Sequence, residues 1–249
     1  MHEVWLYSLI SVIIVSLISL LGVIAIYIEA ERLKKFLIYM VSFAAGALLG
    51  DAFIHLLPEA VEKSGIILNT SIFILSGIVI SFIIEKIIHW RHCHHPTTKK
   101  HPHPYAIMNL IGDCIHNFID GLIIAGSYLI SIPVGIATTL AVILHEIPQE
   151  IGDFGILLYG GFSKGKALFF NFITALTAVI GVVIALIISN YIENLANFLI
   201  PFAIGSFIYI AGSDLIPELH KEVKIKNSII QLALFILGIL VMCLLLLLE

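Results

Sequence analysis

The string His116-Asn117-Phe118-Ile119-Asp120-Gly121 lies in the middle of the apolar stretch Tyr105–Ile130. A second polar string, His145-Glu146-Ile147-Pro148-Gln149-Glu150, lies in the next apolar stretch, Ile132–Tyr159. A carboxylate at the centre of a membrane helix costs about 2.5–3.5 kcal/mol on insertion scales, so several of them need a compensating partner. Imidazole, amide and carboxylate groups together suit a divalent metal ion. The two strings therefore indicate metal binding inside a membrane.

The composition around these strings is that of an integral membrane protein. The 249 residues are 60% hydrophobic and only 12% charged, whereas about 25% of the residues of a soluble domain are charged. A helical span needs about 20 apolar residues, and the unbroken runs exclude the alternating pattern of barrel strands. The sequence therefore predicts an all-α membrane protein, a single transport domain over residues 1–249. Its eight expected spans are Val4–Ile28, Phe36–Leu57, Ile66–Ile88, Tyr105–Ile130, Ile132–Tyr159, Ala167–Ser189, Leu195–Ile216 and Ser228–Leu248.

Basic residues predict the orientation of these spans. Twelve of the 13 Lys and Arg residues fall in or beside the loops that follow the odd-numbered spans, and Lys63 is the exception. Cytoplasmic loops carry the excess of Lys and Arg. We therefore expect these loops in the cytoplasm, both termini outside, and the plasma (inner) membrane as the location.

Two of the spans share a pattern that suggests an internal repeat. Span 2 contains Phe43-Ala44-Ala45-Gly46, with Pro58-Glu59 twelve residues after the glycine. Span 7 contains Phe202-Ala203-Ile204-Gly205, with Pro217-Glu218 at the same distance. Because spans 2 and 7 run in opposite directions in the expected topology, the repeat would be inverted, as in many transporters. This predicts a 3+2+3 arrangement, with spans 1–3 and 6–8 as the two halves around spans 4 and 5.

The central spans each carry one polar stripe. Residues at i, i+3, i+4 and i+7 share one face of a helix, and a short connection makes spans 4 and 5 antiparallel neighbours. Pro148 removes a helical hydrogen bond and should kink span 5. The candidate ligands on the two stripes are Asp113, His116, Asn117, Asp120, His145, Glu146, Gln149, Glu150 and Asp153.

One or two of these residues could simply hold the bundle together through hydrogen bonds. Nine of them on two facing stripes favour cation binding, because spans 4 and 5 contain no Lys or Arg and uncompensated carboxylates bind protons or cations. Two histidines with carboxylates suit zinc first. Manganese, ferrous iron, cobalt and cadmium stay open as alternatives.

At these residues the chain resembles the ZIP (Zrt/Irt-like) family of divalent metal transporters. The matching motifs are His116-Asn117-x-x-Asp120-Gly121 and His145-Glu146-Ile147-Pro148-x-Glu150. The resemblance implies zinc uptake into the cytoplasm through a site between spans 4 and 5. By analogy, His116, Asp120 and His145 would bind the main ion, and Asn117 and Glu146 would line the same site or an adjacent one.

The resemblance also implies a homodimer and an elevator-like motion of the central helices. One departure concerns Gln149, whose position carries His or Glu in many relatives. A neutral amide is a weaker ligand than either, so this residue argues against a second metal site and could change the metal preference.

Two further groups of residues could serve the same transport. Asp51 and His55 are i, i+4 neighbours near the outer end of span 2, where they could line the access path or bind the metal; the alternative is local hydrogen bonding. The loop 89–104 is a histidine-rich cytoplasmic tract of the kind that binds metals, unless it is merely polar. Its candidate ligands are His92, His94, His95, His101 and His103.

Two other functions compete with metal transport. A His-Glu-x-x-His helix would indicate an intramembrane metalloprotease, but Gln149 stands where the second histidine would be. A proton-coupled transporter of another solute could use the carboxylates as a relay, although the two histidines would then have no special purpose. We therefore expect a transporter and no enzyme, with divalent ions and the lipid bilayer as partners and no nucleic acid.

Overall fold

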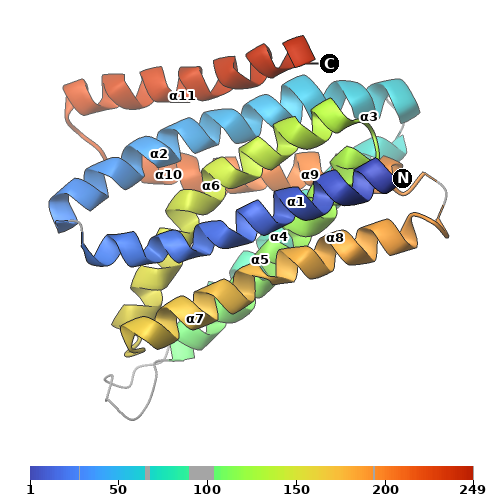
Figure 1. Cartoon of the computed structure of the whole chain (residues 1–249). Helices are drawn as coiled ribbons and strands as arrows, with labels where there is room; N and C mark the ends of the chain where they lie inside the picture. Colours follow the sequence, from blue (N-terminus) through green and yellow to red (C-terminus); the bar gives the residue numbers. More distant parts are fainter. Residues whose placement is uncertain (28, 65–67, 90–103, 193, 249) are drawn as a thin grey trace.

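A computed structural model describes residues 1–27, 29–64, 68–89, 104–192 and 194–248 (Figure 1). Within these ranges the chain is helical and contains no β-strand. Each of the eight predicted stretches corresponds to one helix or to a series of helical segments in line. The elements are α1 (His2–Ile18), η1 (Ser19–Ile26), α2 (Ala30–Gly50), η2 (Asp51–Leu56), α3 (Leu57–Ser64), α4 (Leu68–His89), α5 (Pro104–Tyr128), α6 (Ile132–Tyr159), α7 (Lys164–Ala175), α8 (Thr177–Ile188), α9 (Ala196–Tyr209), η3 (Ile210–Leu215), α10 (Ile216–Leu219), α11 (Ile225–Leu245) and η4 (Leu246–Leu248).

Seven of the helical stretches in the described ranges are long and apolar enough to cross a membrane. The fourth predicted span, α5, is not among them. With 25 residues, α5 is about 37 Å long, enough to cross a hydrocarbon core of about 30 Å. The predicted all-helical membrane fold is therefore confirmed, while the 3+2+3 grouping of its spans stays a prediction.

The helices pack in pairs through glycines that allow backbone to touch backbone. A Cβ atom on Gly46 of α2 would lie 2.0 Å from the carbonyl oxygen of Phe235 in α11. A Cβ atom on Gly205 of α9 would lie 2.0 Å from the carbonyl oxygen of Ile74 in α4. Small residues at such contacts let membrane helices approach closely. The third pair of this kind joins α5 to α8 through Gly121 and Gly181.

Two π-helical turns interrupt the second and seventh spans at matching positions. The turn η2 begins five residues after Gly46, and η3 begins five residues after Gly205. Both end two residues before the prolines Pro58 and Pro217 that the repeat had paired. The equal spacing supports the internal repeat inferred from the sequence. Asp51 and His55, which the sequence analysis paired, both lie within η2.

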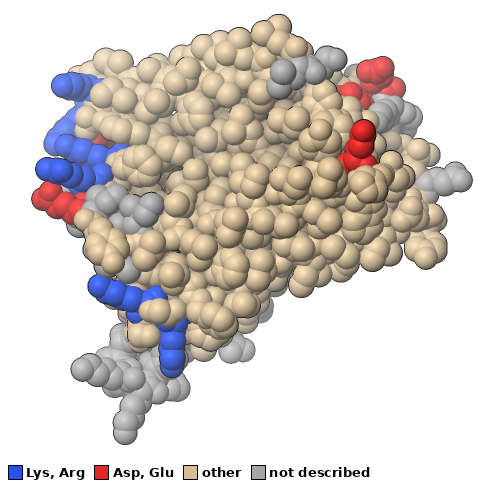
Figure 2. Space-filling model, viewed as in Figure 1, with Lys and Arg blue, Asp and Glu red and all other residues tan. Residues whose placement is uncertain are grey.

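Charged residues gather at the two ends of the bundle. On the face shown in Figure 2, the Lys and Arg side chains lie at the end opposite to both chain termini. This end is called the basic end below. Between the two ends the visible surface is free of charge, as expected where lipid covers it.

We expect an alanine at either repeat glycine to destabilise the bundle. Gly46→Ala and Gly205→Ala each force a methyl group against a backbone carbonyl, and overpacking of this kind costs about 1–3 kcal/mol or more. The measurement is thermal unfolding of the purified protein in detergent. Gly155→Ala in α6 is the control, because nothing lies within 4 Å of its added Cβ. Equal melting temperatures for all three variants would contradict the close helix approach.

Candidate metal site

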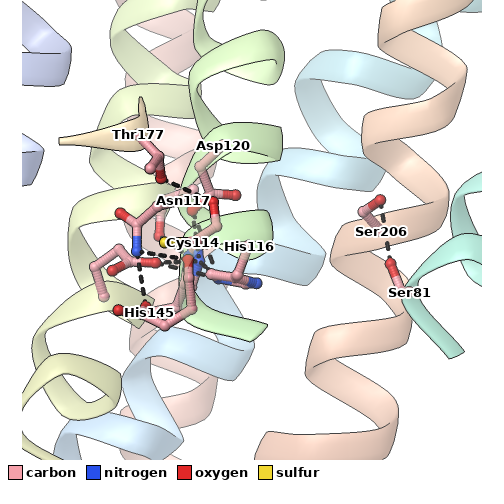
Figure 3. Close-up of polar contacts among 11 residues, drawn as sticks. Ser81, Cys114, His116, Asn117, Asp120, His145, Thr177 and Ser206 are labelled. Carbon is pink, nitrogen blue, oxygen red and sulfur yellow. Dashed lines mark hydrogen bonds and ion pairs between the residues drawn. The ribbon is translucent and has the colours of Figure 1, made fainter. Parts of the chain in front are cut away.

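The candidate site lies midway along the two central helices. A short turn over residues 129–131 joins α5 to α6, and Ser131 caps α6 by accepting a hydrogen bond from the Val134 amide. The helix α6 continues through Pro148, and its two halves run in different directions in Figure 1. Figure 3 shows His116 and Asp120, one turn apart on α5, pointing toward His145 of α6.

Four side chains converge there: His116, Asp120, His145 and Glu146. One ligand atom from each lies within 4.8 Å of the other three. His116 Nε2 is 3.2 Å from His145 Nε2, 3.6 Å from Asp120 Oδ2 and 3.1 Å from Glu146 Oε1. His145 Nε2 is 3.2 Å from Asp120 Oδ2 and 3.5 Å from Glu146 Oε1.

These distances match the edges of a tetrahedron around a small metal ion. Zinc binds His nitrogen and carboxylate oxygen at about 2.0–2.2 Å, which places neighbouring tetrahedral ligands about 3.3–3.6 Å apart. The five measured separations lie between 3.1 and 3.6 Å. Five of the six separations in the set of two imidazoles and two carboxylates are therefore close to those of a tetrahedral zinc site.

The surroundings of the four atoms also favour a cation. Asp120 Oδ2 and both Glu146 oxygens are buried, and the groups that approach Asp120 Oδ2 and Glu146 Oε1 at 3.1–3.6 Å are the two histidines of the cluster. A buried carboxylate without a partner is costly. Neither α5 nor α6 contains a Lys or Arg in its sequence, so a metal ion would supply the missing positive charge.

A hydrogen bond on the ring nitrogen that points away from the cluster orients His145. His145 Nδ1 lies 3.1 Å from the carbonyl oxygen of Ala141, one turn earlier on α6. When Nδ1 donates to that carbonyl, the lone pair of Nε2 is left facing the cluster. Metal-bound histidines usually have such a partner on their other nitrogen.

One of the four residues borders an open cavity. The side chains of Asp120, His145 and Glu146 are 1% exposed, whereas that of His116 is 20% exposed. A cavity of about 620 Å³ borders His116 and Asp120 and extends to Glu218 and Lys221. These two residues form an ion pair at the end of α10, Glu218 within the helix and Lys221 two residues beyond it. The cavity thus connects the cluster with the basic end of the bundle.

The structure separates several other predicted ligands from the cluster. The Asn117 side-chain amide donates to Asp113 Oδ1 at 2.8 Å and to the Asp113 carbonyl at 3.2 Å. Asp153 accepts a hydrogen bond of 3.0 Å from Asn109. These residues form pairs of their own beside the four-residue cluster, and Asp113 and Asp153 line the cavity.

Glu150 also lies outside the cluster. Its Oε2 atom accepts a 2.6 Å hydrogen bond from Asn171 of α7, which is itself fully buried. Gln149 lines the cavity together with His116 and Asp120. The stripe predicted for α6 is therefore divided among the cluster, the cavity and a contact with α7.

The remaining candidates lie elsewhere. His55 is buried, and its Nε2 lies 2.9 Å from the carbonyl oxygen of Met242 in α11. Asp51 is buried at the start of η2, and neither residue joins the four-residue cluster. The histidines predicted in the loop, His92, His94, His95, His101 and His103, lie outside the described residues.

Two asparagines matter here that the sequence reading missed. Asn109 stands one turn before Asp113, so extending the i, i+4 stripe of α5 would have found it. Asn171 is a buried polar residue in the apolar run of span 6. A polar residue inside such a run indicates a polar partner, as the carboxylates of spans 4 and 5 do. Both asparagines donate to buried carboxylates, Asn109 to Asp153 and Asn171 to Glu150.

Comparison with known proteins adds an independent finding. The family model described as "ZIP Zinc transporter" matches residues 2–106 and 103–246 of this chain. The chain is 32% identical to zinc transporter ZIP13 of Danio rerio, over 98% of this chain and 87% of that protein. It is 30% identical to a ZIP13 homolog of Drosophila melanogaster, over 96% and 88%. It is 28% identical to zinc transporter SLC39A7 of Mus musculus, over 98% and 70%.

The geometry predicts different effects for two neighbouring glutamates. Glu146→Gln replaces a carboxylate of the cluster and should weaken zinc binding by about tenfold or more, whereas Glu150→Gln should leave it intact. The measurement is the rise in melting temperature on adding zinc to the purified protein, which follows the affinity. Equal losses in both variants would contradict the separation of Glu150 from the site.

Proposed function

Because the chain belongs to the ZIP zinc transporter family, we propose that it carries zinc across a membrane through the cluster between α5 and α6. Members of this family are transporters rather than enzymes, and the spans of the chain are those of a membrane protein. Transport of a metal ion follows from the family. The ion, the site and the direction are the parts proposed here.

The observation that carries the proposal is the tetrahedral set of His116, Asp120, His145 and Glu146. Its ligands are nitrogen and oxygen with no thiolate, which suits an ion that has to be released again. Manganese(II) favours sites richer in oxygen, and iron(II) uses two histidines and a carboxylate in sites that keep further coordination positions open rather than in closed tetrahedral ones. Zinc therefore fits the set best, and cobalt, cadmium, iron(II) and manganese(II) are the competing ions to test.

The cavity favours movement of the ion toward the basic end. On that side the site borders open space of about 620 Å³. On the other side the next turns of α5 and α6 contain fully buried apolar residues, among them Ile123, Ile124 and Val142. Since Lys and Arg mark the cytoplasmic side of a membrane protein, the form described here is open toward the cytoplasm. Uptake into the cytoplasm is the corresponding direction, with both termini outside.

The protease alternative loses its support. A zincin helix provides two histidines one turn apart on the same helix, whereas the two histidines here come from α5 and α6. A proton-coupled carrier of another solute would leave the two facing imidazoles unexplained. The plasma membrane as location and the homodimer both stay predictions from the sequence.

The central test is metal uptake into liposomes that contain the purified protein. We expect uptake of zinc above that of the other divalent ions, and a loss of about tenfold or more in His116→Ala, His145→Ala and Asp120→Ala, since each removes a ligand. His220→Ala is the control, because this histidine is exposed beyond α10. Undiminished uptake in the three site variants, with the control also active, would rule out the cluster as the transport site.

A second test asks whether Gln149 reaches the metal. Gln149→His replaces a weak amide ligand by an imidazole in the cavity that His116 borders, so zinc binding should tighten by about tenfold. The measurement is competition between the protein and a fluorescent zinc indicator. Gln231→His in α11 is the control, since Gln231 is buried away from the cavity. An unchanged affinity for Gln149→His would place residue 149 out of reach of the ion.

A further inference from the structure

A second cavity lies on the opposite face of α5 from the metal cluster. It has a volume of about 690 Å³ and is lined by side chains of α4, α5, α8 and α9 and of the turn between α8 and α9. Phe118 and Leu122 of α5 form its inner end, and Ile188 and Phe198 stand nearer the turn. We call this cavity the apolar groove.

The apolar groove lies at a seam between two tightly packed helix pairs. Gly121 and Gly181 bring α5 and α8 into backbone contact, and Gly77 and Gly205 do the same for α4 and α9. Where one pair meets the other, large side chains such as Phe73 and Phe118 keep the helices apart. The groove is thus the space that remains between two close-packed units.

Its surroundings determine what can fill it. The helices α4, α8 and α9 belong to stretches long and apolar enough to cross a membrane. The lining residues Ile184, Ile188 and Phe198 are 37%, 36% and 40% exposed, so the groove opens toward the surface that faces lipid. Water has no polar partners along such walls, and an apolar molecule gains by covering them.

The length and polarity of the groove match one lipid chain. Phe118 lies ten residues before the end of α5, a distance of about 15 Å, which is half of a hydrocarbon core of about 30 Å. The polar residues of the lining are Asn194, in the turn after α8, and Asn197, in the first turn of α9. The turn after α8 lies on the side of the chain termini (Figure 1). An acyl chain would lie along the apolar part, and the ester groups of the lipid would meet the amides.

We propose that the apolar groove binds one acyl chain of a phospholipid from the membrane leaflet on the side of the chain termini. The chain would reach Phe118, which directly follows His116 and Asn117 on α5. The bound lipid would therefore contact the back of the helix that holds two of the four clustered side chains. The proposal is independent of which metal ion the cluster binds.

The test uses the full chain in phosphatidylcholine liposomes with a trace of phosphatidylcholine that carries a diazirine near the end of one acyl chain. After illumination, labelled peptides are quantified by mass spectrometry. We expect residues 184–199 to be labelled about fivefold more than residues 229–240 of α11. That stretch of α11 is the control surface, because Ile229, Leu232 and Leu240 are 61%, 59% and 51% exposed.

Two variants distinguish the groove from the general lipid surface. Ile184→Trp places a large ring in the groove and should reduce labelling of 184–199 to the level of α11. Ile180→Trp, one turn away on α8 and 53% exposed but outside the groove, should leave it unchanged. The rise in melting temperature with zinc reports that both variants are folded.

Equal labelling of the two segments in the parent protein would overturn the proposal. The proposal would also be overturned if both tryptophan variants reduced the labelling of 184–199, or if neither of them did. Protection of 184–199 below the level of α11 would show that a second copy of the chain covers the groove instead of lipid.

Discussion

The structure depends on two carboxylates, Asp120 and Glu146, that are buried in the middle of a membrane bundle between two helices whose sequences contain no Lys or Arg. Their charge has to be met by protonated histidines or by a bound cation, because burial of an unpaired charge is strongly unfavourable. His116 and His145 approach them at 3.1–3.6 Å, as ligands of a shared ion would. In the proposed function, the two imidazoles and two carboxylates are the ligands of one small divalent ion, and the distances between their four atoms are what would select it.

This polar centre needs a stiff frame, and the frame is made by glycines. The pairs α2–α11, α4–α9 and α5–α8 have backbone against backbone, which membrane helices achieve only with small residues at the contact. Each pair forms one block, because a single added methyl group at these glycines would collide with the backbone of the partner helix. The cavity toward the basic end and the apolar groove both lie outside these contacts. Open space in this molecule therefore occurs between the blocks.

The sequence predicted the helices and the centre of the site, and it missed what tertiary contacts decide. The apolar runs and the stripe His116, Asp120 on α5 follow from periodicity alone. On α6 the same reasoning grouped Glu146 with Glu150, but Glu150 meets Asn171 from a helix that is distant in sequence. No local pattern contains that partner. The turn η2 also escaped prediction, since a single extra residue in a helix leaves the hydropathy profile unchanged.

The matching positions of η2 and η3 have a consequence for the backbone of the second and seventh spans. A π-turn arises when a helix gains one residue that its neighbours accommodate as a bulge. Both halves carry this bulge five residues after their repeat glycine, Gly46 in one and Gly205 in the other. A proline two residues beyond each turn removes a backbone donor, so the same local feature accompanies the irregular turn in both spans. The two spans therefore leave the regular helical hydrogen-bond pattern at the same distance from the glycine through which each one packs against its partner helix.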